Sequence, residues 1–109
     1  MAAKRFGASL LASNTNKCVM TGSPGQDSTV NVVFCNQNAM PVRVWLAYSH
    51  ENTDDCTIRD TDWLRYGVEV TANGFLEVRG IAVEAGFSLI AKSNNSGVSV
   101  VAYGFGEAA

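Results

Sequence analysis

The sequence is short of charge and of the patterns that bind nucleic acid or cross a membrane. Only 17% of its 109 residues are charged, compared with about 25% in an ordinary soluble domain. The net charge of −2 leaves no basic surface for phosphate groups. No apolar run approaches the roughly 20 residues of a membrane span. We therefore expect no nucleic-acid partner, no membrane partner, and a surface of which other subunits cover a large part.

The sequence also lacks a secretion signal and the length for a second domain. The apolar stretch at 8–12 is broken and too short for the core of a signal peptide. We therefore expect the protein to be made in the cytoplasm. A length of 109 residues suits one domain, and 47% apolar residues suffice for one hydrophobic core.

Short apolar-rich runs separated by turn residues are what the sequence does contain, most regularly between Trp63 and Phe105. Such strands are not stable alone and must stack into a sandwich or barrel. We predict an all-β fold, an antiparallel β-sandwich of about seven to eight strands over residues 17–109. The expected strands lie at 17–20, 29–35, 42–48, 66–71, 75–79, 81–83, 87–92 and 98–105, with a kink at Gly80.

Two pairs of neighbouring runs are predicted to form hairpins. The runs 29–35 and 42–48 are separated by a short polar link, which is typical of an antiparallel pair. The runs 66–71 and 75–79 flank Asn73-Gly74, a dipeptide that favours a tight turn. We therefore expect each pair to lie side by side in one sheet.

The first sixteen residues are predicted to form an N-terminal arm outside the sandwich. Residues 1–16 contain Phe6, Leu10 and Leu11 but show no clear period. Such a segment either lies on its own domain or reaches across to a neighbouring subunit. Both alternatives stay open, and the three apolar side chains are candidate interface residues.

Trp45 and Tyr103 are candidate residues of an outer face. Each alternates with apolar neighbours that are expected to point into the core. Two aromatic side chains on one outer face could form a protein interface or a platform for a sugar ring. A third interpretation is that the core is simply two-sided at these strands.

Three cysteines, an odd number, show none of the spacings of a zinc site. Cys18, Cys35 and Cys56 are therefore either free, mostly buried thiols or candidates for a disulfide between subunits after release from the cell. Cys56 lies in a polar stretch and is the best candidate for exposure.

No set of residues predicts catalysis, a metal or another cofactor. The single histidine, His50, shares the polar stretch 50–62 with Cys56, and such a loop is solvated by default. Glu69, Glu77 and Glu84 alternate with apolar neighbours and are expected to face solvent or to pair with a cation. We therefore expect neither an enzyme nor a small-molecule substrate, although an activity centred on the His50 loop remains a third alternative.

Several strings of the chain resemble small virion proteins of tailed bacteriophages. They are Thr-Val-Asn-Val-Val-Phe-Cys-Asn at 29–36, Val-Arg-Val-Trp-Leu-Ala-Tyr at 42–48, Asp-Trp-Leu-Arg-Tyr-Gly-Val at 62–68, Asn-Gly-Phe-Leu-Glu-Val-Arg-Gly-Ile at 73–81 and Gly-Val-Ser-Val-Val-Ala-Tyr-Gly-Phe at 97–105. The resemblance covers residues 15 to 107. It implies a non-enzymatic β-sandwich subunit that binds copies of itself and other virion proteins.

The expected function is therefore structural. We expect a subunit of the virion that forms a ring or sheath around the neck, collar or tail through protein–protein interfaces. A capsid-decoration protein is the alternative within the same class. A carbohydrate-binding module that uses Trp45 and Tyr103 is the alternative from another class.

Overall fold

The computed structural model describes residues 2–22, 25–49 and 58–108, and these residues form strands and turns but no helix. The described residues form eight strands, which confirms the predicted all-β fold. Their bounds are β1 (Ala2–Leu11), β2 (Lys17–Thr21), β3 (Gln26–Asn36), β4 (Val42–Tyr48), β5 (Trp63–Val70), β6 (Phe75–Val83), β7 (Ser88–Ser93) and β8 (Val98–Ala108).

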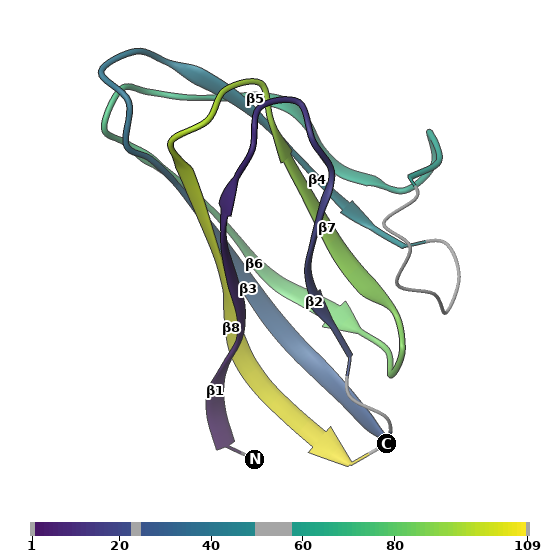
Figure 1. Cartoon of the computed structure of the whole chain (residues 1–109). Helices are drawn as coiled ribbons and strands as arrows, with labels where there is room; N and C mark the ends of the chain where they lie inside the picture. Colours follow the sequence, from purple (N-terminus) through teal and green to yellow (C-terminus); the bar gives the residue numbers. More distant parts are fainter. Residues whose placement is uncertain (1, 23–24, 50–57, 109) are drawn as a thin grey trace.

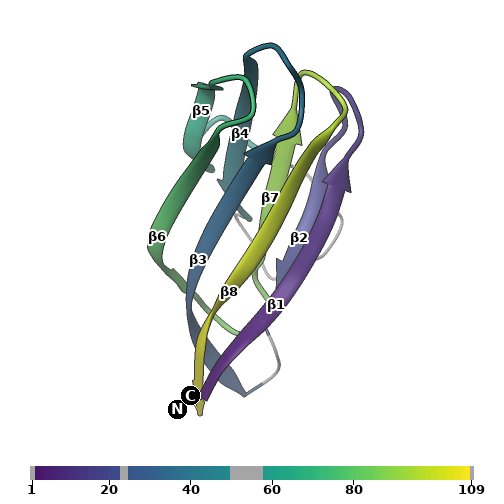
Figure 2. The same cartoon turned by 90° about the vertical axis from the view of Figure 1, so that its left-hand side faces the viewer.

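The strands form two antiparallel sheets that pack face to face. Sheet A has the order β1-β8-β3-β6 and sheet B has the order β2-β7-β4-β5. Figure 2 looks onto sheet A, with sheet B behind it. Apart from the connection from β4 to β5, every connection between consecutive strands passes from one sheet to the other (Figure 1). This order is that of a jelly roll, a β-sandwich built of two Greek keys.

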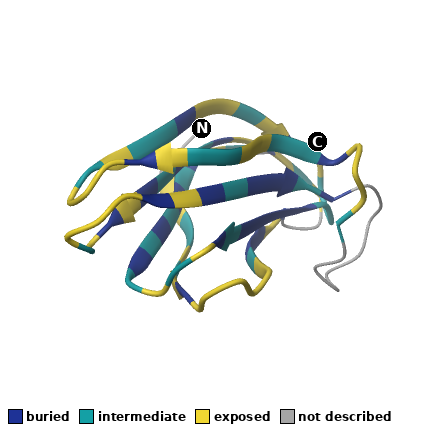
Figure 3. Ribbon diagram, turned by 90° about the horizontal axis from the view of Figure 1, so that it is seen from above, coloured by how far each residue is buried: buried dark blue, intermediate teal, exposed yellow. Residues whose placement is uncertain are grey.

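The core lies between the sheets because alternate side chains point inward from both. Along β3, Val30, Val32 and Phe34 are fully buried, while the residues between them are partly or fully exposed. Figure 3 shows how buried and exposed residues are distributed along the strands; β7, in contrast to β3, is buried over almost its whole length. The largest fully buried side chains are Phe34, Leu11, Leu46, Leu89, Ile90, Val30, Val32, Val42, Val44, Val70, Val83 and Val98.

The two predicted hairpins do not form. Strand β3 lies in sheet A and β4 in sheet B, and the same separation holds for β5 and β6. In each case the short connection carries the chain across the core instead of turning it back within one sheet. Alternation specifies which side of a strand is buried, but it does not specify the sheet to which the strand belongs.

The segment expected to be an arm is part of the sandwich. Residues 2–11 form β1, which pairs antiparallel with β8 of the same chain from Ala2 opposite Gly106 to Leu11 opposite Val98. The chain therefore enters the sandwich at its first strand, and the boundary expected after residue 16 is not seen. The missing period has a physical cause, because β1 is interrupted by a bulge between Arg5 and Gly7.

Each of the four edge strands is bulged, whereas the two central ladders are continuous. The pairings β1–β8, β2–β7, β3–β6 and β4–β5 contain shifts of register, and the additional residue always lies on the edge strand. The β3–β8 and β4–β7 ladders run without such a shift over the described residues. Bulges twist an edge away from a flat conformation and so protect it from pairing with another chain.

Two of these bulges depend on glycine. Gly67 in β5 has a φ of 61° and Gly80 in β6 has a φ of 72°, a left-handed conformation that strains other residues. The kink predicted at Gly80 is therefore confirmed as a bulge. The freed amide of Gly80 donates a hydrogen bond of 3.0 Å to the Asn31 side chain of the neighbouring strand.

A buried asparagine joins the two sheets at one end of the sandwich. Asn36, at the end of β3, is 1% exposed. Its side-chain nitrogen donates to the carbonyl oxygens of Met40 (2.8 Å), Val70 (3.2 Å) and Thr71 (3.1 Å), and its side-chain oxygen accepts from the amide of Asn38 (2.9 Å). One side chain thus provides hydrogen-bond partners for backbone groups both in the connection from β3 to β4 and at the end of β5.

We expect Asn36→Leu to lower the free energy of unfolding by about 3 kcal/mol, because buried carbonyl oxygens lose their donor. Chemical denaturation measures the change. Gln37→Leu, a substitution of the exposed neighbour, is the control and should change stability by less than about 0.5 kcal/mol. A loss below about 1 kcal/mol for Asn36→Leu would show that water replaces the side chain.

Candidate functional site

The inner faces of both sheets are used by the core, so the outer faces are where the molecule can bind a partner. The register of sheet A places its outward residues in four rows across the strands. The first row is Leu10, Ser99, Cys35 and Phe75; the second is Ala8, Val101, Val33 and Glu77; the third is Arg5, Tyr103 and Asn31, with Arg79 and Gly80 at the bulge; the fourth contains Phe105, Thr29 and Ala82.

This outer face of sheet A is unusually apolar for a solvent-facing surface. Of the five large apolar side chains that are exposed among the described residues, three lie on it: Leu10 (68%), Phe75 (71%) and Phe105 (42%). Val33 and Val101 lie side by side at its centre and are half-buried. Leu10 and Phe75 lie at the two ends of the first row and Phe105 lies in the fourth, so exposed apolar side chains are distributed over the whole face. Exposed apolar groups that gather on one face are typical of a protein interface.

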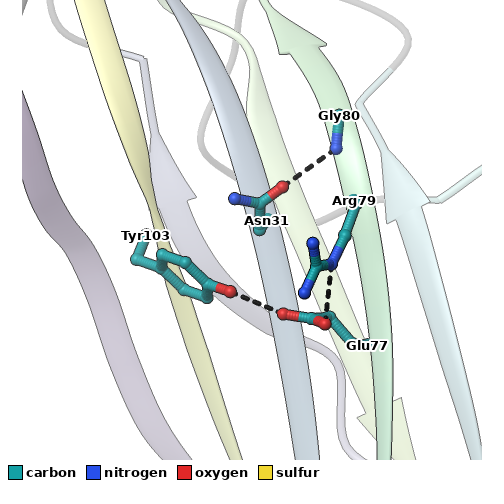
Figure 4. Close-up of polar contacts among 5 residues, drawn as sticks. All are labelled: Asn31, Glu77, Arg79, Gly80 and Tyr103. Carbon is teal, nitrogen blue, oxygen red and sulfur yellow. Dashed lines mark hydrogen bonds and ion pairs between the residues drawn. The ribbon is translucent and has the colours of Figure 1, made fainter.

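A polar network crosses the same face (Figure 4). The hydroxyl of Tyr103 donates to Oε2 of Glu77 at 2.5 Å, and Nε of Arg79 donates to Oε1 of the same carboxylate at 2.8 Å. The tyrosine comes from β8 and the other two residues from β6, so the network spans β3, which lies between them. Glu77 therefore has both of its oxygens engaged within the chain.

The network changes the acidity of its members. The hydrogen bond from Tyr103, followed by that from Arg79, lowers the pKa of Glu77. The same Tyr103–Glu77 hydrogen bond raises the pKa of the tyrosine, because the carboxylate stabilises the protonated phenol. At neutral pH the Glu77 carboxylate and the Arg79 guanidinium are therefore ionised, the Tyr103 phenol is neutral, and the three groups satisfy one another by hydrogen bonds.

A hollow of about 370 Å³ lies beside this network on sheet A. It is lined by Lys4, Asn31, Tyr103, Gly104 and Phe105. The two aromatic rings make its wall mainly apolar, while Lys4 and Asn31 supply polar groups. Its volume is at the low end of the range of small-molecule sites, and it is large enough to admit a side chain of a partner.

The outer face of sheet B carries a different cluster. Trp45 of β4 contacts Tyr66 of β5 edge to face at 6.2 Å between ring centroids, and Trp63 contacts Tyr66 in the same way at 5.2 Å. The ammonium of Lys92 lies 4.5 Å from the centre of the Trp45 ring and 5.9 Å from that of Trp63. Tyr66 is 70% exposed, so its ring is the accessible part of this aromatic cluster.

The structure separates the candidate interface residues that the sequence grouped together. Leu10 is exposed, but Leu11 is 2% exposed and belongs to the core. Phe6 is half-buried and packs against the core, because it is the additional residue of the β1 bulge. Of the three apolar residues of the expected arm, Leu10 alone presents its side chain fully to a partner.

A platform shared by Trp45 and Tyr103 is contradicted by the topology. Trp45 lies on the outer face of sheet B, and Tyr103 lies on the outer face of sheet A, on the opposite side of the sandwich. Both residues point outward as predicted. Alternation along each strand could not show that the two strands belong to different sheets.

Cys35 is an exposed free thiol in the first row of sheet A. This position contradicts the expectation of buried free thiols and leaves Cys35 as a candidate for contacts between subunits. Cys18 is half-buried in β2 and is disulfide-bonded. Cys56 and His50 lie outside the described residues.

Metal-binding clusters and membrane-spanning helices are not found in the part of the chain that the structure describes. Residues 2–22, 25–49 and 58–108 contain no group of three or more His, Cys, Asp or Glu side chains that could hold a metal ion. Among the same residues, no helix is long and apolar enough to cross a membrane.

The sequence did not indicate that Phe75, Phe105 and Tyr66 are surface residues. Each lies in a strand where an aromatic residue is ordinarily taken for core. A signal existed for Phe75, which directly follows the Asn73-Gly74 turn and therefore begins its strand at the end of the sandwich. Of the two alternatives expected for Glu77, solvent or a cation, the structure shows the cation: Glu77 pairs with Arg79, two positions further along the same strand.

Neither a family model, nor a curated protein, nor a solved structure shows significant similarity to this chain.

We expect Tyr103→Phe to raise the pKa of Glu77 towards its ordinary value of about 4.3, because the substitution removes the hydrogen bond that lowers it most. The stabilisation from ionised Glu77 is complete above that ordinary value and is lost as the pH falls through the lowered pKa of the folded state. Carbon NMR of the carboxyl group measures the titration. Tyr66→Phe is the matched control, and an unchanged Glu77 pKa in Tyr103→Phe would contradict the assignment.

Proposed function

We propose that the protein is a structural subunit of a tailed-bacteriophage virion. It assembles as a ring or sheath around the neck, collar or tail, in contact with copies of itself and with other virion proteins. Capsid decoration is the alternative position on the same particle. The observation that carries the proposal is the outer face of sheet A, where Leu10, Phe75 and Phe105 are exposed together.

Three features support a role in assembly. The strings that resemble tailed-phage virion proteins extend through most of the sandwich, including β3, β4, β6 and β8. The jelly roll is a fold that viral coat proteins use repeatedly. The low charge content fits a surface that is largely covered in the assembled state.

The bulged edges favour assembly through faces and turns over assembly through strand pairing. A flat, regular edge strand would offer its backbone to a neighbouring copy. All four edges of this sandwich deviate from that geometry. Contacts between subunits then depend on side chains, which also provide the specificity that a closed ring requires.

The test is to locate the chain on particles of the phage that encodes it. Mass spectrometry of purified particles should find the chain at a fixed ratio to the major capsid protein, and cryo-EM should place it on the neck, collar or tail. Density on the capsid shell would favour the decoration alternative. A chain that is recovered only from the soluble lysate would reject the structural role.

A matched pair of variants should distinguish the two outer faces. Phe75→Ser on sheet A is expected to reduce incorporation into particles at least tenfold, because it removes a large exposed apolar contact. Tyr66→Ser on sheet B removes a side chain of similar exposure, 70% against 71%, and should leave incorporation unchanged.

The aromatic cluster of sheet B supports a second candidate function, carbohydrate binding by the virion. The exposed ring of Tyr66, held edge-on by Trp45 and Trp63, could stack on the apolar face of a sugar. This platform on sheet B does not include Tyr103. Lys92 lies over Trp45 and leaves Tyr66 as the ring for stacking.

Glycan-array binding tests this second candidate. Binding should be lost in Tyr66→Ala and in Trp45→Ala, the latter because the supporting ring is removed, and it should persist in Tyr103→Ala. If Tyr103→Ala lost glycan binding and Tyr66→Ala retained it, the sugar would bind to sheet A. That result would reject the proposed platform on sheet B.

A further inference from the structure

We propose that a second copy of the chain covers the outer face of sheet A. The two copies are related by a two-fold axis that lies in the plane of the interface, perpendicular to the strands, between the Val33 row and the Asn31 row. This inference rests on the proposed function for the expectation that copies of the chain contact one another. In this arrangement each strand of sheet A lies over its own copy, running in the opposite direction. The first row then meets the fourth row of the second copy, and the second row meets the third.

Large side chains meet small ones under this axis. Phe75, at the β6 end of the first row, lies over Ala82 of the second copy, and Phe105 lies over Ser99 of the second copy. Both phenylalanines are exposed in the single chain. The alternation of large and small residues across facing positions is what close packing between two surfaces requires.

Leu10 and the hollow on sheet A are also complementary. Leu10 lies on β1 in the first row and is 68% exposed. The axis directs it to the β1 and β8 end of the opposite face, where Lys4, Tyr103 and Phe105 line the hollow. Its side chain therefore enters an apolar recess on the second copy, and by symmetry the second copy does the same.

The charges of the face match as well. Glu77 is in the second row and Arg79 is at the bulge in the third row, on the same strand and on either side of the axis. The carboxylate of each copy therefore stands opposite the guanidinium of the other. The pair that exists within each chain becomes a four-membered network across the two-fold axis.

The face is large enough for a stable contact. Four strands about 4.8 Å apart and four rows about 6.8 Å apart give a projected area of roughly 500 Å². With the corrugation of the side chains, this is of the order of the roughly 800 Å² per partner of a standard interface. An isologous contact of this kind is self-limiting, so the dimer is a unit that a ring or sheath can repeat.

Cys35 provides an independent report of this arrangement. It lies in the first row and faces Thr29 of the second copy, so that its thiol is covered when the dimer forms. The two Cys35 residues are separated by three row intervals, roughly 20 Å. The dimer is therefore not linked through Cys35 and persists in reducing buffer.

Charge reversal in two separate chains tests the axis. Glu77→Lys makes residues 77 and 79 of a copy both positive, and Arg79→Glu makes both negative. Each variant alone should dimerise roughly a hundredfold more weakly than the wild type in analytical ultracentrifugation, because like charges meet across the interface. An equimolar mixture should form heterodimers with wild-type affinity. Such rescue cannot come from contacts within one chain.

Glu69→Lys, an exposed charge reversal on sheet B, is the control and should dimerise like the wild type. The rate of Cys35 alkylation should fall as the wild-type concentration rises through the dimer dissociation constant, but not in either single variant. A wild type that stays monomeric at every concentration of the ultracentrifugation experiment would overturn the inference. So would a mixture that fails to associate, or a dimer linked through Cys35 on non-reducing gels. None of these results affects the particle-location experiment, which tests the proposed function separately.

Discussion

The whole sandwich depends on a chain that crosses between its two sheets at nearly every connection. Such a crossing exposes backbone groups at the end of the core, where they are out of reach of both ladders and must find other partners. Asn36 provides those partners at the end where β3 leaves sheet A, by donating to three carbonyl oxygens and accepting from one amide. The amide of Asn36 itself donates to the carbonyl of Gly74 at the β5–β6 turn. One buried polar side chain thereby fixes the relative position of two sheet-to-sheet crossings, and the inner faces pack against each other as a consequence.

The same topology leaves four strand edges, and their treatment decides how the molecule can associate. In each edge strand an additional residue interrupts the ladder, and in three of them that residue contributes apolar surface to the core: Phe6 in β1, Val19 in β2 and Leu64 in β5. The bulges thus add to stability while they remove the regular edge that another chain could extend. Since the edges are protected and the inner faces pack in the core, the surfaces left for the proposed association are the outer faces and the turns.

The sequence predicted the strands well because each depends on local alternation and on turn residues. The run 42–48 coincides with β4, and the break at Gly80 coincides with the bulge of β6. Strand β1 was missed because its bulge shifts the alternation at Phe6, so that the two halves of the strand are out of phase. The sheet to which each strand belongs was not predictable either. A four-residue connection such as 71–74 can reverse a strand in its own sheet or pass it to the facing sheet, and tertiary packing alone selects between these outcomes.

The assignment of strands to sheets also decides which outward residues share a face. For this reason the sequence could identify residues of the candidate site, but not the face on which each of them lies. Trp45 and Tyr103 were both correctly expected to point outward, yet they belong to opposite faces with different chemistry. On sheet B, the Trp45 ring already contacts Lys92 and Tyr66 of its own chain. On sheet A, Tyr103 and Arg79 hold both oxygens of Glu77, so the carboxylate is fixed in one position. A surface whose charges are already fixed loses little conformational entropy when a partner arrives. Preorganisation of the charged groups beside exposed apolar side chains is therefore the physical reason to propose sheet A, and not sheet B, as the face that binds another subunit.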